Sequence, residues 1–268
     1  MEPAPDHDTR TGSVARPGGR SLSWRSTGPV GAPVLLWMHG STGSARTAPR
    51  ATGVRVLAYD RPGFGGSTVH PDRDLRSDAD DVGALLDQVG VAEARVLAFS
   101  GGAAPAYAFA ARFPERLRCL AVVSGVTWPA GPVPPLDVLR QAATTLRADP
   151  VAAVDRLGHD APPRDRLVLA DPHLRQELVR GARDALAEGV RGWVHEALLV
   201  RGPWPLVPSD VQVPVTLWHG DQDLAVPIAA AETTAEALPD ARLVRLADAG
   251  HLGWLTQRSA IVRSVLAG

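Results

Sequence analysis

The sequence predicts an α/β protein with a doubly wound, mostly parallel sheet, and two patterns along its 268 residues favour this fold class. Short apolar runs recur, each followed by turn residues, which is typical of strands buried on both faces. Segments with apolar residues at helical spacing lie between these runs. Strands that alternate with helices predict parallel strands joined by crossover helices.

The predicted strands are runs of four to seven residues. The first alternates apolar and polar residues, and the others are mostly apolar. In chain order they are 21–25, 34–37, 55–59, 95–99, 117–123, 215–218 and 242–246. The helices expected beside the sheet centre on 82–89, 107–111 and 254–266.

The chain divides into three predicted parts. Residues 1–20 are rich in proline, glycine and charged residues and show no periodicity, so we expect a mobile N-terminal arm. Residues 21–125 and 209–268 are expected to form the α/β core. Residues 126–208 contain no convincing strand and are expected to form a helical cap over one edge of the sheet. Helical segments of the cap are expected at 136–146, 151–157 and 174–187.

The composition narrows the range of partners and compartments. Apolar residues make up 45% of the chain and charged residues 21%, with a formal net charge of −1, so the charge favours neither nucleic acid nor an anionic membrane as a partner. The one cysteine, Cys119, cannot form an internal disulfide. The first residues lack the apolar run of a signal peptide, and no apolar stretch reaches the length of a membrane span, so we expect a cytoplasmic protein.

The basic residues are all of one kind. All 28 are arginine, and the chain has no lysine and no asparagine. Because the codons for lysine and asparagine are rich in A and T, this bias indicates a bacterium with a GC-rich genome. The number of arginines therefore does not by itself indicate a binding patch.

The pattern around Ser100 predicts a catalytic nucleophile. Residues 98–102 read Ala-Phe-Ser-Gly-Gly, follow a predicted strand and precede a predicted helix. This context matches the nucleophile elbow G-x-S-x-G, with Ala98 in place of the first glycine. Small flanking residues allow the serine to occupy a sharp, strained turn, and the N-terminal dipole of the following helix favours developing negative charge. The alternative interpretation is a Ser-Gly-Gly turn without chemistry.

A nucleophilic serine needs a base and an acid. His251 lies between the last predicted strand and the last predicted helix and follows both Ser100 and an acidic segment, which is the chain order expected for an elbow of this type. Asp223 is the favoured acid and Asp221 the alternative. One of the two aspartates is expected only to shape its turn and cap the following helix.

Backbone N–H groups are needed to stabilise the negative charge that develops on a substrate oxygen. Gly101, directly after the candidate nucleophile, is expected to supply one donor, and Ser41, after the second predicted strand, the other. His39 and His219 also follow predicted strands, and we interpret both as hydrogen-bonded loop residues.

Other candidate sites concern the substrate pocket and cofactors. Trp128, Trp193 and Trp204 lie in the expected cap and favour an apolar or aromatic substrate pocket, unless they only pack the cap onto the sheet. No pair of histidines or cysteines has the spacing of a metal site. Residues 63–66 lack the pattern and the helix of a dinucleotide-binding loop, and no Walker A sequence occurs. We therefore expect neither a metal nor an organic cofactor.

With these motifs in this order, the sequence resembles the α/β-hydrolase superfamily over residues 21–268. The resemblance depends on 39–43 (HGSTG), 59–67 (YDRPGFGGS), 99–102 (FSGG), 219–223 (HGDQD) and 250–251 (GH). It implies an α/β-hydrolase fold with a helical cap inserted after the sixth strand. It also implies a triad of Ser100, Asp223 and His251, because the acid of the family usually falls three residues after the glycine.

The sequence departs from the pattern of the superfamily at two places. Ala98 occupies the first position of the elbow, where the family usually has glycine. The segment 44–53 is short for the helix that usually links the oxyanion loop to the next strand. The geometry of the loop that contains Ser41 is therefore the feature of the site that the resemblance defines least.

These features predict a serine hydrolase that acts on a small-molecule ester, lactone or related acyl substrate through an acyl-enzyme. One alternative is an enzyme of the same fold that does not hydrolyse its substrate, such as an acyl transferase, a C–C bond-cleaving enzyme or a cofactor-free cyclase. Another is a ligand-binding protein that has lost turnover, although the intact set of candidate catalytic residues argues against it. The natural substrate and the oligomeric state are left open by the sequence.

Overall fold

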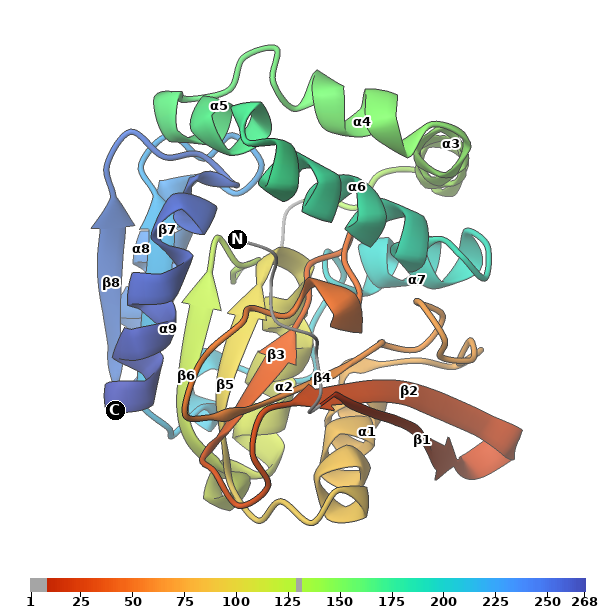
Figure 1. Ribbon diagram of the computed structural model, residues 1–268, viewed down its shortest axis with the longest axis vertical. Helices are drawn as coiled ribbons and strands as arrows, with labels where there is room; N and C mark the ends of the chain where they lie inside the picture. The colour runs from red at the N-terminus through yellow and green to blue at the C-terminus, as the bar shows by residue number, and fades with distance from the viewer. Residues whose placement is uncertain (1–8, 129–131) are drawn as a thin grey trace.

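A single sheet organises the computed structural model, which describes residues 9–128 and 132–268. The strands are β1 (Arg10–Arg16), β2 (Arg20–Thr27), β3 (Val34–Met38), β4 (Arg55–Tyr59), β5 (Ala94–Phe99), β6 (Leu117–Val123), β7 (Val215–Gly220) and β8 (Ala241–Leu246). In these residues they form an eight-stranded sheet with the order β1-β2-β4-β3-β5-β6-β7-β8. The β1–β2 and β2–β4 pairs are antiparallel and the other pairs are parallel, so the predicted fold class is confirmed (Figure 1).

Helices cover both faces of this sheet. The helices beside it are α1 (Leu75–Gln88), α2 (Ala103–Arg112), α8 (Ile228–Ala237) and α9 (Arg258–Ala267). Helices α1, α2 and α8 lie on one face and α9 on the other (Figure 1). None of the helices in the described ranges combines the length and the apolar character that a membrane span requires.

Strand β3 shows why the central runs are apolar at every position. Leu36 and Met38 pack into the cluster that contains α1 and α2, whereas Leu35 and Trp37 pack into the cluster that contains α9. Successive side chains of a strand point to opposite faces, so a strand covered on both faces buries all of them. All five residues of β3 are buried, as the continuous run predicted.

The N-terminal segment differs from the prediction. Residues 10–20 are not a mobile arm, because Arg10–Arg16 forms β1 and pairs with β2 across a turn in which Gly18 and Gly19 have positive φ. Arg16 and Arg20, on either side of this turn, donate hydrogen bonds to the buried Asp81 of α1. This strand has no local signal, because an edge strand with one buried residue has no apolar run. Residues 1–8 of the expected arm lie outside the described residues.

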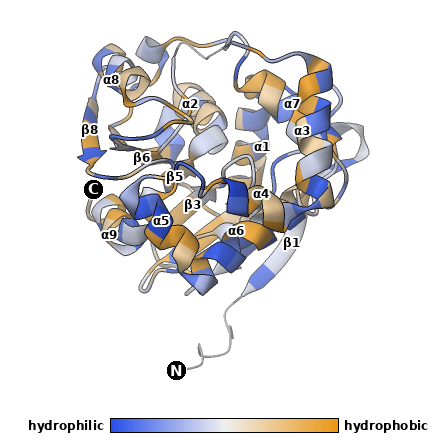
Figure 2. Cartoon of the chain, turned by 90° about the horizontal axis from the view of Figure 1, so that it is seen from above, coloured by the Kyte–Doolittle hydropathy of each residue, from blue (hydrophilic) through white to orange (hydrophobic). Residues whose placement is uncertain are grey.

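The helical cap follows the sixth strand. Its helices are α3 (Leu136–Ala148), α4 (Pro150–Arg156), α5 (Pro163–Ala170), α6 (Pro172–Ala185) and α7 (Arg191–Leu199). They lie beyond the carboxyl ends of the parallel strands, and α4, α5 and α6 lie over the central strands in both views (Figures 1 and 2). Helices α5 and α7 were not among the predicted segments. Helix α5 begins at Pro163, and a proline usually indicates a turn or a helix end, although it is well tolerated in the first turn of a helix.

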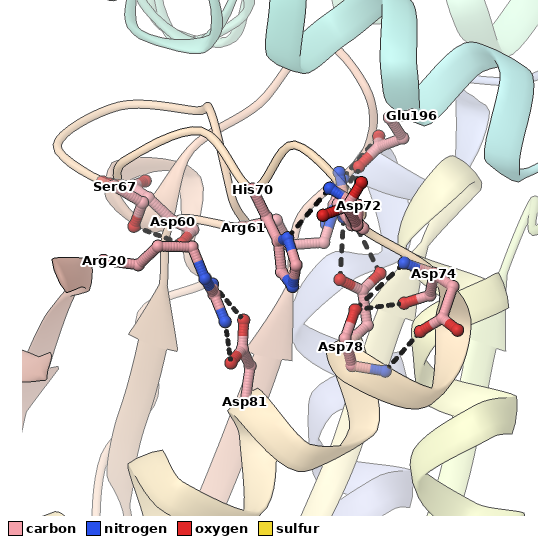
Figure 3. A network of polar contacts seen from close by, with 12 residues as sticks. Arg20, Asp60, Arg61, Ser67, His70, Asp72, Asp74, Asp78, Asp81 and Glu196 are labelled. Atoms are coloured by element: carbon pink, nitrogen blue, oxygen red, sulfur yellow. Dashed lines mark hydrogen bonds and ion pairs between the residues drawn. The ribbon is translucent and has the colours of Figure 1, made fainter. Parts of the chain in front are cut away.

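A buried ionic cluster joins the cap to the core (Figure 3). Arg61, which follows β4, donates from Nε and Nη2 to the two carboxylate oxygens of Glu196 on α7, at 2.6 and 2.7 Å. Arg73 donates to the same carboxylate at 3.1 Å and to Asp78 of α1 at 2.7 and 2.9 Å. The cluster therefore contains two cations and two anions, all buried.

The charges of this cluster depend on one another. Burial alone would raise the pKa of Glu196, but the guanidinium groups of Arg61 and Arg73 outweigh burial and hold that pKa well below its usual range. Removal of one partner from a buried ion pair leaves the other charge without compensation in a medium of low dielectric constant. The cluster is therefore far more sensitive to the loss of one member than a surface ion pair.

We expect Glu196→Gln to lower the free energy of unfolding by about 3–5 kcal/mol, because two buried guanidinium groups lose their shared carboxylate. Glu232→Gln is the matched control, since Glu232 pairs with Arg245 at 2.7 Å near the surface, where loss of a pair costs about 0–1 kcal/mol. Urea titrations of both variants measure the difference. Equal losses in the two variants would contradict this account of the cluster.

Candidate active site

Ser100 occupies a strained turn between β5 and α2. Its φ is 51°, in the left-handed region that non-glycine residues rarely adopt. The turn brings neighbouring atoms very close: a Cβ on Gly102 would lie 2.4 Å from the backbone carbonyl oxygen of Met38, and one on Gly101 would lie 2.1 Å from the side-chain oxygen Oγ of Ser41. Small residues after the serine are therefore a steric requirement of this turn. Ala98, which replaces the usual first glycine, is fully buried in β5.

The structure brings Ser100, His251 and Asp223 into one chain of hydrogen bonds. Ser100 Oγ lies 2.9 Å from His251 Nε2, and His251 Nδ1 lies 2.9 Å from Asp223 Oδ2. A carboxylate can only accept, so Nδ1 carries the proton and donates it to Asp223. Nε2 is then free to accept the hydroxyl proton of Ser100. This is the arrangement of a base held in the correct tautomer by an acid.

Asp223, rather than Asp221, accepts the hydrogen bond from His251. Its side chain is buried, and Oδ1 accepts the backbone N–H groups of Ala225 and Val226 at 2.8 and 2.9 Å, whereas Asp221 is exposed. Burial alone would raise the pKa of Asp223, but the hydrogen bond with His251 and the N–H groups outweigh burial and lower that pKa. The carboxylate therefore stays ionised beside the imidazole.

The two histidines that the sequence assigned to loops are hydrogen-bonded to the backbone. His39 Nδ1 donates to the carbonyl oxygen of Gly40 at 2.8 Å, and His39 Nε2 accepts the N–H of Arg61 at 3.4 Å. His219 Nε2 donates to the carbonyl oxygen of Val226 at 2.8 Å. Each ring thus fixes a loop that borders the site, as predicted.

Ser41 and Gly101, the predicted oxyanion donors, lie close together: a Cβ on Gly101 would lie 2.1 Å from Ser41 Oγ, and Ser41 lines the same cavity as Ser100. The loop that contains Ser41 is closed by a hydrogen bond from the N–H of Gly43 to the carbonyl oxygen of Gly40, at 3.0 Å. Arg61 Nη1 also donates to the carbonyl oxygen of His39, so the buried ionic cluster supports this loop. The short segment 44–53 holds a 3-10 turn, Ala45–Thr47. The role of the two N–H groups as donors stays a prediction.

A cavity of about 460 Å³ opens beside Ser100 and His251. Most of its wall is apolar and comes from the cap and the loop after β7. The apolar side chains include Leu146, Ala153, Val154, Leu157, Leu178 and Leu224. Arg156, His159 and Asp160 are polar members of the same wall. The volume is typical of a site for a small ligand.

The three tryptophans predicted to line the pocket lie elsewhere among the described residues. Trp128 packs against Tyr107 and Trp204, with ring centroids 4.4 and 4.7 Å apart. Trp193 packs beside the buried Leu186 and Phe64. These large rings cover apolar surface where the cap meets the core, which removes more area from water than the wall of an open cavity would.

Sequence reasoning missed Asp165, a buried aspartate of α5 whose carboxylate accepts backbone N–H groups from the loop that carries His251. Nothing in the local sequence distinguishes it from a surface aspartate, because it lies between two arginines in a short helix. Within 9–128 and 132–268, no group of three or more histidine, cysteine, aspartate or glutamate residues could hold a metal ion.

Known proteins resemble this chain in sequence and in fold. The family model described as alpha/beta hydrolase fold matches residues 33–170. A pimeloyl-(acyl-carrier protein) methyl ester esterase from Aromatoleum aromaticum is 31% identical over 240 residues, which cover 84% of this chain and 93% of the relative. A hydrolase from Pseudomonas aeruginosa has a TM-score of 0.78 at 23% identity, covering 97% of this chain and 99% of that chain. An esterase from Exiguobacterium antarcticum has a TM-score of 0.77 at 18% identity, covering 96% and 98%.

The buried His39 makes stability depend on pH. Burial and the neighbouring Arg61 guanidinium lower the pKa of His39 to about 3, whereas an unfolded chain has a histidine pKa of about 6.5. Below pH 6.5 the unfolded state binds the extra proton, so stability falls as the pH drops from 6.5 to 3, and the loss due to His39 amounts to about 2 kcal/mol at pH 5.

Denaturant titrations at pH 7 and pH 5 measure this effect. We expect wild type to lose about 2 kcal/mol more on acidification than His39→Gln, in which the amide keeps a donor and an acceptor but does not titrate in this range. The same loss in both proteins would show that His39 is not the group responsible.

Proposed function

The chain belongs to the alpha/beta hydrolase fold family, and from that premise we propose that it is a serine hydrolase that cleaves a small-molecule carboxylic ester, lactone or related acyl substrate. The observation that carries this proposal is the chain of two 2.9 Å hydrogen bonds from Ser100 through His251 to Asp223, beside a cavity of small-ligand size. The esterase named among its relatives supports an ester as the bond attacked.

In the proposed reaction His251 Nε2 accepts the hydroxyl proton of Ser100 while Oγ bonds to the acyl carbon. The N–H groups of Ser41 and Gly101 donate to the oxyanion of the tetrahedral intermediate. The bond to the alcohol then breaks, and His251 returns the proton to the departing oxygen. Water adds to the acyl-enzyme with His251 as base, which releases the acid and restores Ser100.

Asp223 contributes to this reaction through charge and orientation. Its hydrogen bond holds the imidazole with Nε2 towards Ser100, and its negative charge stabilises the imidazolium that forms when the proton moves. The lowered pKa keeps the carboxylate charged through the neutral range. No other ionised group is required for the proton transfers.

The apolar wall of the cavity favours a substrate that carries an apolar substituent. Aliphatic side chains of the cap surround the space next to Ser100, so an alkyl or aryl group bound there would be removed from water. The volume of about 460 Å³ supports a small molecule as the partner rather than a polymer. We propose that the apolar group is the acyl chain or the alcohol of the ester.

We expect Ser100→Ala to lower the turnover of p-nitrophenyl butyrate by a factor on the order of 10⁶, because the nucleophile is lost. Ser124→Ala is the matched control: Ser124 also follows a parallel strand and has a positive φ of 44°, and it should keep turnover within about a factor of three. Initial rates, with labelling of Ser100 by a fluorophosphonate, measure both. Unchanged turnover in Ser100→Ala would refute the proposal.

A bulky residue in the cavity should shorten the preferred ester. Ala153→Trp on α4 is expected to lower kcat/KM for p-nitrophenyl octanoate on the order of 10–100-fold while acetate changes little, because the long chain loses its apolar space. Ala152→Trp changes the preceding residue of the same helix, which does not line the cavity, and should leave the ratio unaltered. A parallel loss for both esters in Ala153→Trp would rule out this cavity as the chain-binding site.

A further inference from the structure

We propose that Asp165, on the cap helix α5, is a positioning residue that holds His251 in its reacting orientation. This inference rests on the proposed function, because it concerns the base of the same reaction. It assigns to the cap an indirect part in the chemistry, through the orientation of His251, in addition to its part in enclosing the substrate.

The contacts of Asp165 lie on both sides of the histidine. Oδ1 accepts the N–H of Gly250 at 2.8 Å, and Oδ2 accepts the N–H of Leu252 at 2.9 Å. The two oxygens of one carboxylate thus bind the residues immediately before and after His251. Hydrogen bonds to an ionised acceptor are roughly twice as strong as neutral ones, so they restrict the backbone from which the imidazole extends.

The loop is shaped to admit this carboxylate. Asp165 is 5% exposed, and a Cβ on Gly250 would lie 2.7 Å from its Oδ2. A Cβ on Gly253 would lie 2.8 Å from Oδ1. Real Cβ atoms do not approach oxygen so closely, so the absence of side chains at 250 and 253 allows α5 to reach the loop.

Arg164 reinforces the attachment beside Asp165. Its backbone N–H donates to the carbonyl oxygen of Asp248 at 3.0 Å, and its Nε donates to that of Ala247 at 2.7 Å. The first turn of α5 therefore binds the loop at four residues, 247, 248, 250 and 252. Such a set of contacts fixes position, whereas a single contact would only add stability.

A purely structural role would make a different prediction from a positioning role. If Asp165 only held the cap on the core, its loss would lower stability but leave the folded enzyme equally active. If it positions His251, the folded variant should bind substrate normally and react slowly, because misplacement of a catalytic group by about 1 Å can cost on the order of 100-fold in rate.

Asp165→Asn is the variant that tests this inference. The amide keeps the shape of the side chain but offers one acceptor oxygen and one NH₂, so one of the two N–H groups of the loop faces a donor. Asp171→Asn is the matched control. Asp171 on the cap also accepts two backbone N–H groups, from His173 and Leu174 at 2.8 and 3.1 Å, but both lie in its own helix α6.

We expect kcat of Asp165→Asn for p-nitrophenyl butyrate to fall about 10–100-fold with KM within about threefold, and Asp171→Asn to keep both values. The downfield proton resonance of the His251 Nδ1–H should broaden or move in Asp165→Asn only. This resonance needs no substrate, so it tests the position of His251 even if wild type fails to hydrolyse esters, an outcome that would count against the proposed function alone.

A folded Asp165→Asn protein with wild-type kcat and an unchanged resonance would overturn the inference. If that variant does not fold, Arg164→Ala is the second variant, because it removes the side-chain donor to Ala247 and keeps the carboxylate. We then expect a smaller loss confined to kcat, about threefold. Wild-type kcat in Arg164→Ala would in that case overturn the inference.

Discussion

The site depends on the path of one loop, residues 247–252, which carries His251 sideways from the end of β8 towards the end of β5. Three strand spacings separate β8 from β5, roughly 14 Å at ~4.8 Å each. The loop crosses the end of β7, where the N–H of Gln222 donates to the carbonyl oxygen of Ala249 at 2.9 Å. A Cβ on Gly220 would lie 2.3 Å from that oxygen, so the crossing requires glycine at the end of β7.

Buried carboxylates recur around the site, and each is stabilised in a different way. Glu196 binds two guanidinium groups, Asp223 binds an imidazole and two backbone N–H groups, and Asp165 binds backbone N–H groups alone. An unpartnered carboxyl in such surroundings would become neutral. Each of these carboxylates has hydrogen-bond partners. These buried, directional hydrogen bonds therefore hold in place the helices and loops that contain the carboxylates.

The sequence predicted what local pattern determines and missed what depends on distant contacts. Ser100 could be identified because a sharp turn after a buried strand admits few residue types, and His251 because it follows the last predicted strand in the chain order expected for such an elbow. Strand β1 could not be identified, because it is defined by its pairing with β2 and not by a run of buried residues. Trp128 was assigned to a pocket because an aromatic side chain suits a pocket and a core equally well, and only the fold decides between them. Asp165 gave no signal, since its partners lie 85 and 87 residues away.

The cap is attached to the core through α5, α6 and α7, and this attachment has a consequence for substrate choice. Helix α7 is fixed by Glu196 and α5 by Asp165, so both are bound to elements that shape the reacting groups. Helix α4, which supplies Ala153 and Val154 to the cavity wall, packs mainly on α3 and α6 of the cap. Substitutions in α4 can therefore alter the shape of the cavity without moving His251 or the loop of Ser41. Asp165 of α5 both lines the cavity and binds the loop of His251, so α5 connects the chemistry to the cavity whose shape α4 can change.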